Sequence, residues 1–165
     1  MEKIHQKISS VLKEKFGESI LEIKEFRGEL TISIRLDTIV EVCCFLKDDS
    51  RFAYKFLTDL FGIDMNIPVN RFGVVYNLYS FANKHRLRLK TFIPEGELKV
   101  PTVSNIWRTA NWHERETYDM FGIIFEGHPD LRRIYLPEEF EHHPLRKDFP
   151  LLGIPGSLPL PKQHQ

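Results

Sequence analysis

The sequence predicts an α+β fold: a mainly antiparallel sheet of two hairpins covered by helices, with an extended, Pro-rich C-terminal segment. Two observations predict the folded part. Apolar residues alternate along the chain in three stretches, as in half-buried strands, and recur at helical spacing in three others. Hairpins whose one face must be covered by helices are typical of α+β domains. Most of the ten prolines follow residue 128, and proline interrupts helices and sheets alike.

The N-terminal third is predicted to contain two helices around a hairpin. Apolar residues recur at helical spacing over residues 4–16, and Gly17 ends this helix. A strand over residues 19–27 and a turn precede a second strand over 30–36, where apolar and polar residues alternate strictly. The second helix, over residues 39–46, has a single apolar face.

The middle of the chain is predicted to form the second hairpin. Residues 51–61 fit a helix by spacing, but their aromatic content suits a strand, so both assignments stay open. Residues 62–70 are predicted as a loop. Residues Phe72, Val74, Tyr76 and Leu78 alternate along the chain, as do Leu87, Leu89, Thr91 and Ile93, which predicts two strands joined by a turn at residues 83–85.

A third helix is predicted from Ser104, whose hydroxyl can cap it, to about Phe121, with Gly122 as its C-terminal stop. Its apolar stripe carries Val103, Trp107, Ala110, Thr117 and Phe121, with Glu114 set into it, and the opposite side carries Arg108, Trp112, Arg115 and Asp119. We divide the chain after this helix. We expect residues 1–122 to form the α+β domain and residues 123–165 to form an extended segment that wraps a partner.

Composition excludes several classes of function. The chain has 23 basic and 23 acidic side chains, whereas nucleic-acid-binding domains are usually basic, so no nucleic-acid partner is expected. The longest uncharged run, residues 149–161, is shorter than the roughly 20 residues of a membrane-spanning helix and is rich in proline. The N-terminus lacks the apolar stretch of a signal peptide, which predicts a cytosolic start.

No residue is predicted to hold an electron carrier or a metal. The two cysteines, Cys43 and Cys44, are adjacent, which disfavours a disulfide. They are also too few for the four ligands of an iron–sulfur cluster. Neither a Gly-x-Gly loop nor a Walker loop is present. We therefore expect no catalytic, cofactor-binding or metal-binding residue in this chain.

Charged residues on the third helix allow two interpretations. Arg115 and Asp119 stand four residues apart and can pair on the helix surface. Glu114 interrupts the apolar stripe, so it should meet an arginine, with Arg132 and Arg133 as candidates. From residue types alone, a solvated charged face is favoured over a set of charges that docks a partner or braces the following loop.

Histidines raise the question of a metal site. His113 and Glu114 begin like the His-Glu-x-x-His motif, but Thr117 stands where the second histidine is needed. His128, His142 and His143 lie next to or near prolines, which suits loop anchoring better than ligation. A small metal-dependent hydrolase using His113, His128 and His143, with Glu114 as base, is the alternative from another class.

Prolines bracket residues 143–150, which predicts an extended run. Leu145, Lys147 and Phe149 would then face one side, and Arg146 and Asp148 the other. Such a strip could lie across another protein or fold back on its own domain, and the residues alone do not decide between the two.

Arg86, Arg88 and Lys90 share one face of a predicted strand. A solvated face is favoured there over an acidic partner.

The densest charged stretch resembles a known family. Its residues are Glu114, Arg115, Glu116, Asp119, Phe121 and Gly122, then Gly127, His128, Pro129, Leu131 and Arg133, then His143, Pro144, Leu145, Arg146, Lys147, Asp148, Phe149 and Pro150. In order and spacing they resemble the C-type subunit of bacterial NADH-quinone oxidoreductase, which is the thirty-kilodalton subunit of respiratory complex I. His142 departs from the glycine common in that family, and Thr117 and Tyr135 also differ.

The resemblance implies a non-catalytic structural subunit in the hydrophilic arm of a proton-translocating enzyme. That enzyme passes electrons from NADH through FMN and iron–sulfur clusters, all held by partner subunits, to quinone. The implied partners are the large quinone-site subunit of the D type and the small cluster-bearing subunit of the B type, with a ferredoxin-like subunit as a further neighbour. The implied location is peripheral, on the cytoplasmic side of the bacterial plasma membrane, through the complex alone.

A second implied setting is the corresponding subunit of a membrane-bound hydrogenase or of an F420- or ferredoxin-linked dehydrogenase. The neighbouring subunits would distinguish these assemblies, since only the NADH-dependent one needs an NADH-binding module.

Overall fold

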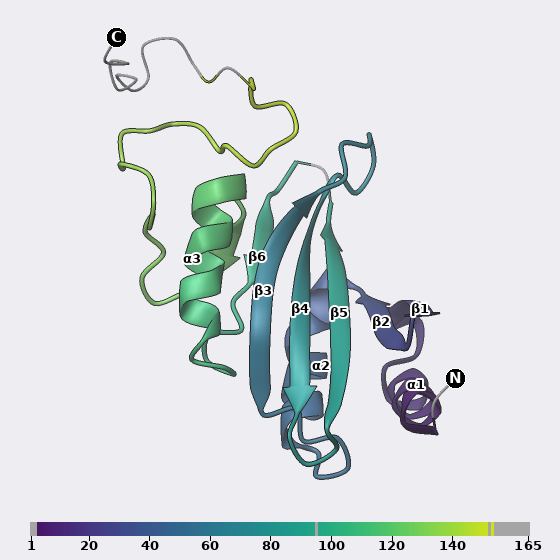
Figure 1. Ribbon diagram of the computed structural model, residues 1–165. Helices are drawn as coiled ribbons and strands as arrows, with labels where there is room; N and C mark the ends of the chain where they lie inside the picture. Colours follow the sequence, from purple (N-terminus) through teal and green to yellow (C-terminus); the bar gives the residue numbers. More distant parts are fainter. Residues whose placement is uncertain (1–2, 95, 152, 154–165) are drawn as a thin grey trace, which may run out of the picture.

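The computed structural model describes residues 3–94, 96–151 and 153 (Figure 1). Its helices are α1 (Lys3–Phe16), α2 (Ile39–Asp48) and α3 (Ala110–Phe121). Its strands are β1 (Ile20–Phe26), β2 (Glu29–Ile34), β3 (Phe56–Asp64), β4 (Phe72–Ser80), β5 (His85–Ile93), β6 (Lys99–Pro101) and β7 (Ile124–Glu126). Short 3-10 turns follow α1 and precede α2. Among the described residues, none of these helices is both long and apolar enough to cross a lipid bilayer.

The main sheet has five strands in the order β1-β2-β5-β4-β3. Three of the four pairings are antiparallel, which confirms the predicted mainly antiparallel α+β fold. The fourth joins β2 to β5 in parallel through Thr31, Ile32 and Ser33. This pairing unites the N-terminal hairpin with the second group of strands and makes β5 an interior strand.

The second group has three strands, where the sequence predicted two. The ambiguous segment is strand β3, and it extends through residues predicted as a loop to Asp64, so the loop prediction for 62–70 was wrong at its start. Gly62 lies inside β3 because a side chain there would strike α3: an added Cβ would sit 2.7 Å from the Phe121 ring. The strand pattern predicted to reach Leu36 ends at Ile34.

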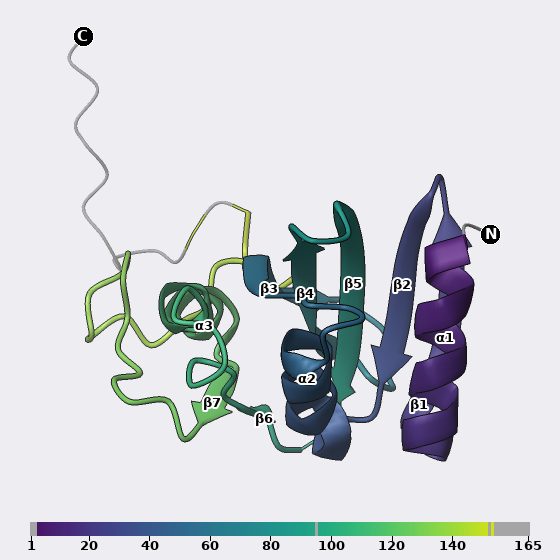
Figure 2. The ribbon, with the colours of Figure 1, turned by 90° about the horizontal axis from the view of Figure 1, so that it is seen from below.

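One face of the sheet is covered by helices. Figure 2 shows α1 and α2 on the same side of the five strands, with α3 beyond β3. Completely buried residues from α1, α2 and the strands make one core, including Ile8, Leu12, Val42, Leu46, Ile32, Tyr76 and Leu89. Burying such side chains stabilises a fold by about 1.5–3 kcal/mol each.

Helix α3 begins later than predicted. Residues after Ser104 form turns, because the indole of Trp107 donates to the Tyr54 carbonyl and packs into the core. The helix ends as expected at Gly122, which has a left-handed φ of 74°. Beyond it, β7 pairs in parallel with β6, and Phe125 is buried. The division of the chain at residue 122 stays a prediction.

Candidate functional site

The charged residues of α3 are mostly buried, so the interpretation as a solvated face was wrong. Glu114 and Asp119 are completely buried, and Arg115 is 9% exposed; Glu116 alone among the four faces solvent. A buried charge is costly unless it is paired or hydrogen-bonded. Each of the three buried groups should therefore have specific partners.

Glu114 is held by the segment that enters α3 from β6. Its carboxylate accepts hydrogen bonds from the Thr102 hydroxyl at 2.5 Å and from the Val103 amide at 2.7 Å. No arginine reaches it among the described residues, so the predicted pairing with Arg132 or Arg133 was wrong. With only neutral donors, burial raises the pKa of Glu114 to about 7, although both hydrogen bonds lower it.

His128 lies close to Glu114 in the turn after β7. Its Nε2 is 3.9 Å from a Glu114 oxygen and donates to the Asn111 carbonyl at 3.1 Å. Its Nδ1 accepts the Asp130 amide at 3.0 Å. A carbonyl can only accept and an amide can only donate, so this ring is neutral with its proton on Nε2. His128 therefore anchors the turn to α3, in agreement with the structural role favoured from sequence.

Asp119 is surrounded by donors from the segment that follows β7. Its carboxylate pairs with Arg133 at 2.8 Å, and it accepts the amides of three successive residues, 134 to 136, at 2.7–3.1 Å. Burial alone would raise the pKa of Asp119, but these four donors lower it below its ordinary value. The backbone of residues 134–136 thus curls around one buried charge.

Arg115 does not pair with Asp119, contrary to the prediction from their spacing. Its guanidinium donates to the carbonyls of Arg132 and Arg133 at 3.2 and 3.3 Å and lies 4.8 Å from the Trp112 ring centroid. Arg115 and Asp119 therefore hold the same short segment through different backbone groups. The alternative in which these charges brace the following loop is confirmed.

Residues 143–150 were predicted to be extended with alternating side chains, and this was wrong. The chain forms successive turns, in which the Arg146 amide donates to the His143 carbonyl and the Phe149 amide to the Arg146 carbonyl. These turns let the run cap α3: Arg146 Nε donates to the Phe121 carbonyl at 2.6 Å, and His143 Nδ1 donates to the Asp119 carbonyl at 3.0 Å. The run folds back on its own domain.

A second acidic residue fixes the same run to strand β3. The buried Asp64 carboxylate accepts the Lys147 amide at 2.8 Å and two guanidinium nitrogens of Arg71 at 2.8–2.9 Å. Arg71 also reaches Asp148 at 3.0 Å. The hydrogen bond from Arg71 is the main cause that lowers the pKa of Asp64. The end of β3 and the C-terminal segment are therefore tied into one unit.

Several large apolar side chains at this end of the molecule are exposed. Trp112 is 63% exposed, Tyr135 66% and Leu145 53%. The Tyr135 amide donates to Asp119 and the Leu145 amide donates to the Met120 carbonyl, whereas Trp112 lies on α3 itself. The remaining residues of the charged stretch differ in exposure. Gly127, Pro129 and Pro150 are exposed, and Leu131, Pro144 and Phe149 are half-buried.

The metal ligands that the hydrolase alternative needs do not converge. His113 lies 3.5 Å from Asp59, while His128 and His143 contact the two different carbonyls described above. Across the described ranges, no three His, Cys, Asp or Glu side chains are grouped closely enough to hold a metal ion. The geometry thus gives the hydrolase alternative no support.

Sequence reasoning missed Thr102, Asp64, Arg71 and Asn111. Asp64 fell in a segment predicted as a loop, and its contact with Lys147 joins residues 83 positions apart. No local pattern encodes such a contact. Thr102 could have been found from the rule that a carboxylate in an apolar stripe needs a donor, which applies to hydroxyl groups as well as to arginine.

Comparisons with known proteins give one consistent family. A family model described as the 30 kDa subunit of respiratory-chain NADH dehydrogenase matches residues 32–154. The C-type subunit of the NADH-quinone oxidoreductase of Geotalea uraniireducens (strain Rf4) is 54% identical over 142 residues, covering 86% of this chain and 85% of the relative. The same subunit of Roseiflexus castenholzii (strain DSM 13941 / HLO8) is 51% identical over 134 residues, covering 81% and 77%.

Two solved structures share the fold. A trypsin-resistant fragment (1-134) of Nqo5 aligns with a TM-score of 0.65 and 33% identity, covering 76% of this chain and 99% of the fragment. A chain of the membrane-bound sulfane sulfur reductase, an archaeal respiratory membrane complex, aligns with a TM-score of 0.75 and 25% identity, covering 92% of this chain and 88% of that chain.

Proposed function

Because this chain belongs to the family of the 30 kDa subunit of respiratory-chain NADH dehydrogenase, we propose that its contribution to the enzyme is a shaped, prefolded docking surface and not chemistry. The chain is a subunit of an NADH-quinone oxidoreductase, complex I of the respiratory chain. It works together with other subunits of that complex. The finer assignments, namely which subunit it touches and where the complex lies, belong to the proposal.

One observation carries this proposal: residues 130–149 are fixed by many hydrogen bonds although large apolar side chains among them face solvent. Asp119, Arg115 and Asp64 hold the backbone of this segment through four amides and two carbonyls. Tyr135 and Leu145 are nevertheless more than half exposed. Fixing a backbone costs conformational entropy, about 1–2 kcal/mol per residue, and the exposed side chains return little of it in the free chain. A partner that covers them would gain apolar burial without that cost.

We assign this surface to the large quinone-site subunit of the D type, with the small cluster-bearing subunit and a ferredoxin-like subunit as neighbours. FMN and the iron–sulfur clusters would then lie in partner subunits. For the clusters, the two adjacent cysteines of this chain cannot supply four thiolates. The complex would hold the chain peripherally, at the cytoplasmic side of the bacterial plasma membrane. Proton translocation would be a property of the whole enzyme.

A second setting is the equivalent subunit of another respiratory membrane complex. The similarity to a chain of the archaeal sulfane sulfur reductase favours it, since the same fold serves in that assembly. The relatives at 44–54% identity, all named as the C-type subunit of NADH-quinone oxidoreductase, favour the first setting. Purification of the complex through a tag on this chain distinguishes them, because a co-purifying NADH-binding module is expected only in the first.

Point substitutions test the docking surface without disturbing the fold. In cells whose only copy of the chain carries Tyr135→Ser and Leu145→Ser, we expect normal amounts of folded chain and at least a tenfold loss of chain in the purified complex. Glu138→Gln, an exposed polar change between the two sites, is the matched control. Undiminished assembly of the double variant would contradict the proposal.

Truncation provides a second test. A chain that ends after Leu136 keeps Arg133 and the three amides around Asp119, but loses the run that caps α3. We expect it to remain folded by circular dichroism and to be missing from the complex. Normal incorporation of this truncated chain would show that residues 137–165 are not needed for docking.

A further inference from the structure

The face of the main sheet opposite α1 and α2 carries no helix or loop of the described chain. Figure 1 looks onto this face, with α2 behind the strands. A sheet is usually covered by a layer on each apolar face. Cross-strand register places Val75, Asn77 and Tyr79 of β4 beside Lys90, Arg88 and Arg86 of β5. This group of residues, together with Phe56, Phe61 and Phe81, is called the open sheet face below.

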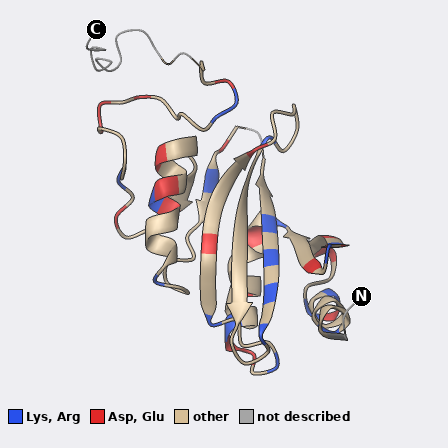
Figure 3. Cartoon of the chain, in the orientation of Figure 1, with Lys and Arg blue, Asp and Glu red and all other residues tan. Residues whose placement is uncertain are grey.

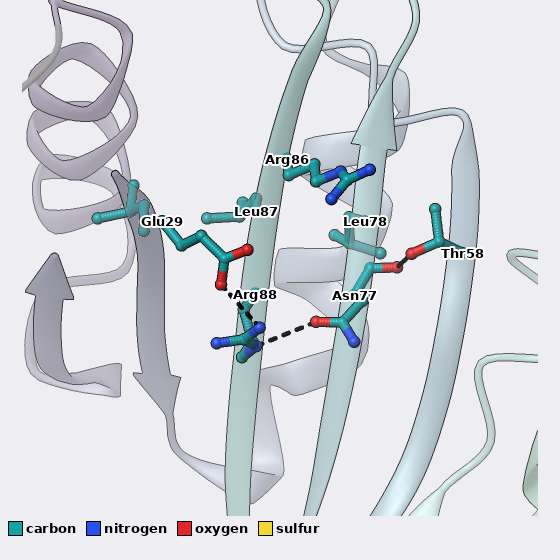
Figure 4. A pocket seen from close by; sticks show the side chains of 8 residues that line it. Glu29, Thr58, Asn77, Leu78, Arg86, Leu87 and Arg88 are labelled. Carbon is teal, nitrogen blue, oxygen red and sulfur yellow. Dashed lines mark hydrogen bonds and ion pairs between the residues drawn. The ribbon is translucent and has the colours of Figure 1, made fainter. Parts of the chain in front are cut away.

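The β5 half of the open sheet face is basic. Figure 3 shows the Lys and Arg positions, in blue, that follow one another along the β5 ribbon. Arg88 is fixed by Glu29 at 2.9 Å and by Asn77 at 3.1 Å, and these residues line a pocket of about 280 Å³ that Arg86 borders (Figure 4). Neither Arg86 nor Lys90 has a carboxylate partner among the described residues. Two cations on this row are therefore left without a counter-charge.

The other half of the open sheet face is aromatic. Phe56 of β3 and Phe81, in the turn after β4, are 39% and 66% exposed, and their ring centroids are 5.7 Å apart. Tyr79 packs edge-on against Phe81 at 5.0 Å. Phe61, next to Val75 in the register, is 37% exposed. Exposed aromatic clusters of this kind are enriched where proteins meet other proteins.

We propose that the open sheet face binds an acidic amphipathic helix of a neighbouring subunit in the same complex, a contact separate from the one made by residues 130–149. Four residues of a strand, the separation of Arg86 and Lys90, span about 13 Å. Residues seven apart share one face of a helix and are separated by about 10 Å, a difference that long basic side chains can bridge. Two carboxylates at that spacing would therefore meet Arg86 and Lys90, while the apolar side of the same helix would cover Phe56, Tyr79 and Phe81.

Charges on the surrounding strands favour a protein over a polyanion. Glu29 lies on β2, the strand beside β5, Glu22 lies on β1, the next strand outward, and Asp59 pairs with Asn77 across β3 and β4. A nucleic acid or an anionic membrane needs an extended positive field, which these three carboxylates interrupt. A helix that carries only a few carboxylates can place them beside Arg86 and Lys90 and away from these three acidic side chains.

Zero-length cross-linking tests the proposal in the intact complex. A carbodiimide joins an amine only to a carboxylate in direct contact with it. We expect Lys90 to be joined to an Asp or Glu in a helical segment of another subunit, identified by mass spectrometry, while Lys13 on α1 stays unjoined. A Lys90 that is unjoined, joined only within its own chain, or joined to a segment that is not helical overturns the proposal.

Charge reversal sharpens this test. We expect Arg86→Glu to lower the yield of the Lys90 cross-link at least fivefold, whereas Lys13→Glu on the opposite side of the molecule leaves it unchanged. An unchanged yield in Arg86→Glu also overturns the proposal. A chain that joins the complex but fails these tests contradicts this inference alone, and a chain that joins no complex contradicts the proposed function as well.

Discussion

The two ends of helix α3 hold a buried carboxylate in opposite ways. Glu114, near the start, has two neutral donors, and its pKa is raised to about 7. Asp119, near the end, has an arginine and three amides, and its pKa is lowered. Both side chains are completely buried. At Asp119 the four donors together outweigh desolvation, whereas at Glu114 the two neutral donors do not.

The two ends also hold different parts of the chain. Glu114 and its neighbours join α3 to the β6 and β7 segments of the folded body. Asp119 joins α3 to the segment we assign to docking. A carboxylate that stays ionised suits the second role, because the docking segment then keeps one conformation across physiological pH.

Asp119→Asn should have the largest effect on stability, because it removes the negative charge that pairs with Arg133 near the end of α3. The substitution leaves Arg133, whose side chain is 7% exposed, without a counter-charge. Breaking a buried ion pair costs about 3–5 kcal/mol, and we expect a loss of that size in the free energy of unfolding from urea titration. Glu116→Gln, an exposed change on the same helix, is the control. A loss below about 1 kcal/mol, the usual range for exposed pairs, would mean that the amides alone hold the segment.

Glu114 should make stability depend on pH. Its pKa is raised on folding from 4.5 to about 7, so its contribution to the free energy of unfolding is full below about pH 4.5 and is lost as the pH rises through about 7. The increase in the pKa of Glu114 on folding, at about 1.4 kcal/mol per pKa unit, corresponds to a contribution of about 3 kcal/mol to the free energy of unfolding. Urea titrations at several pH values should show this slope in the native chain and not in Glu114→Gln. Equal slopes in the two proteins would contradict the assignment.

Gly122→Ala should disturb the Asp119 end while leaving the Glu114 end intact. A Cβ at Gly122 would collide with Arg146 and His143, in a backbone conformation with positive φ. Gly28→Ala is a matched control, since Gly28 has a similar φ of 79° but open space around it. The strain common to both costs about 1–2 kcal/mol. We expect Gly122→Ala to cost more than Gly28→Ala and to speed amide exchange in residues 143–149, and equal costs would argue against the collision.

Asp148→Asn should have the smallest effect. The Asp148 side chain is 60% exposed, and its partner Arg71 keeps the buried Asp64. Exposed ion pairs contribute about 0.2–1 kcal/mol, so we expect a change in the free energy of unfolding within that range. A loss as large as that of Asp119→Asn would show that ion pairs at the two ends of the docking segment stabilise the chain equally.

Much of the fold follows from local patterns in the sequence. Strands β4 and β5 were predicted because apolar and polar residues alternate along each, and α2 because four apolar residues share a helix face. Strand β3 was ambiguous because its outward side chains include Phe56 and Phe61, which removes the polar alternation. The parallel pairing of β2 with β5 joins segments far apart in the chain, and no local pattern reports it.

Less of the site could be predicted. The charged motif pointed to the correct helix through its family resemblance, but spacing alone suggested that Arg115 pairs with Asp119. The partners of Asp119 are mainly backbone amides 15–17 residues away, and backbone groups leave no signature in a sequence. The prolines around residues 143–150 predicted an extended run, but hydrogen bonds to α3 and β3 favour turns instead.

The interior position of β5 has a consequence for synthesis on the ribosome. Strand β2 ends at Ile34, but its second hydrogen-bonding edge stays empty until β5, which begins at His85, has been translated. At ordinary translation rates this interval is on the order of seconds. During that time β2 of the nascent N-terminal hairpin has one unpaired, exposed edge. Ribosome-associated chaperones can bind and protect this edge in that interval.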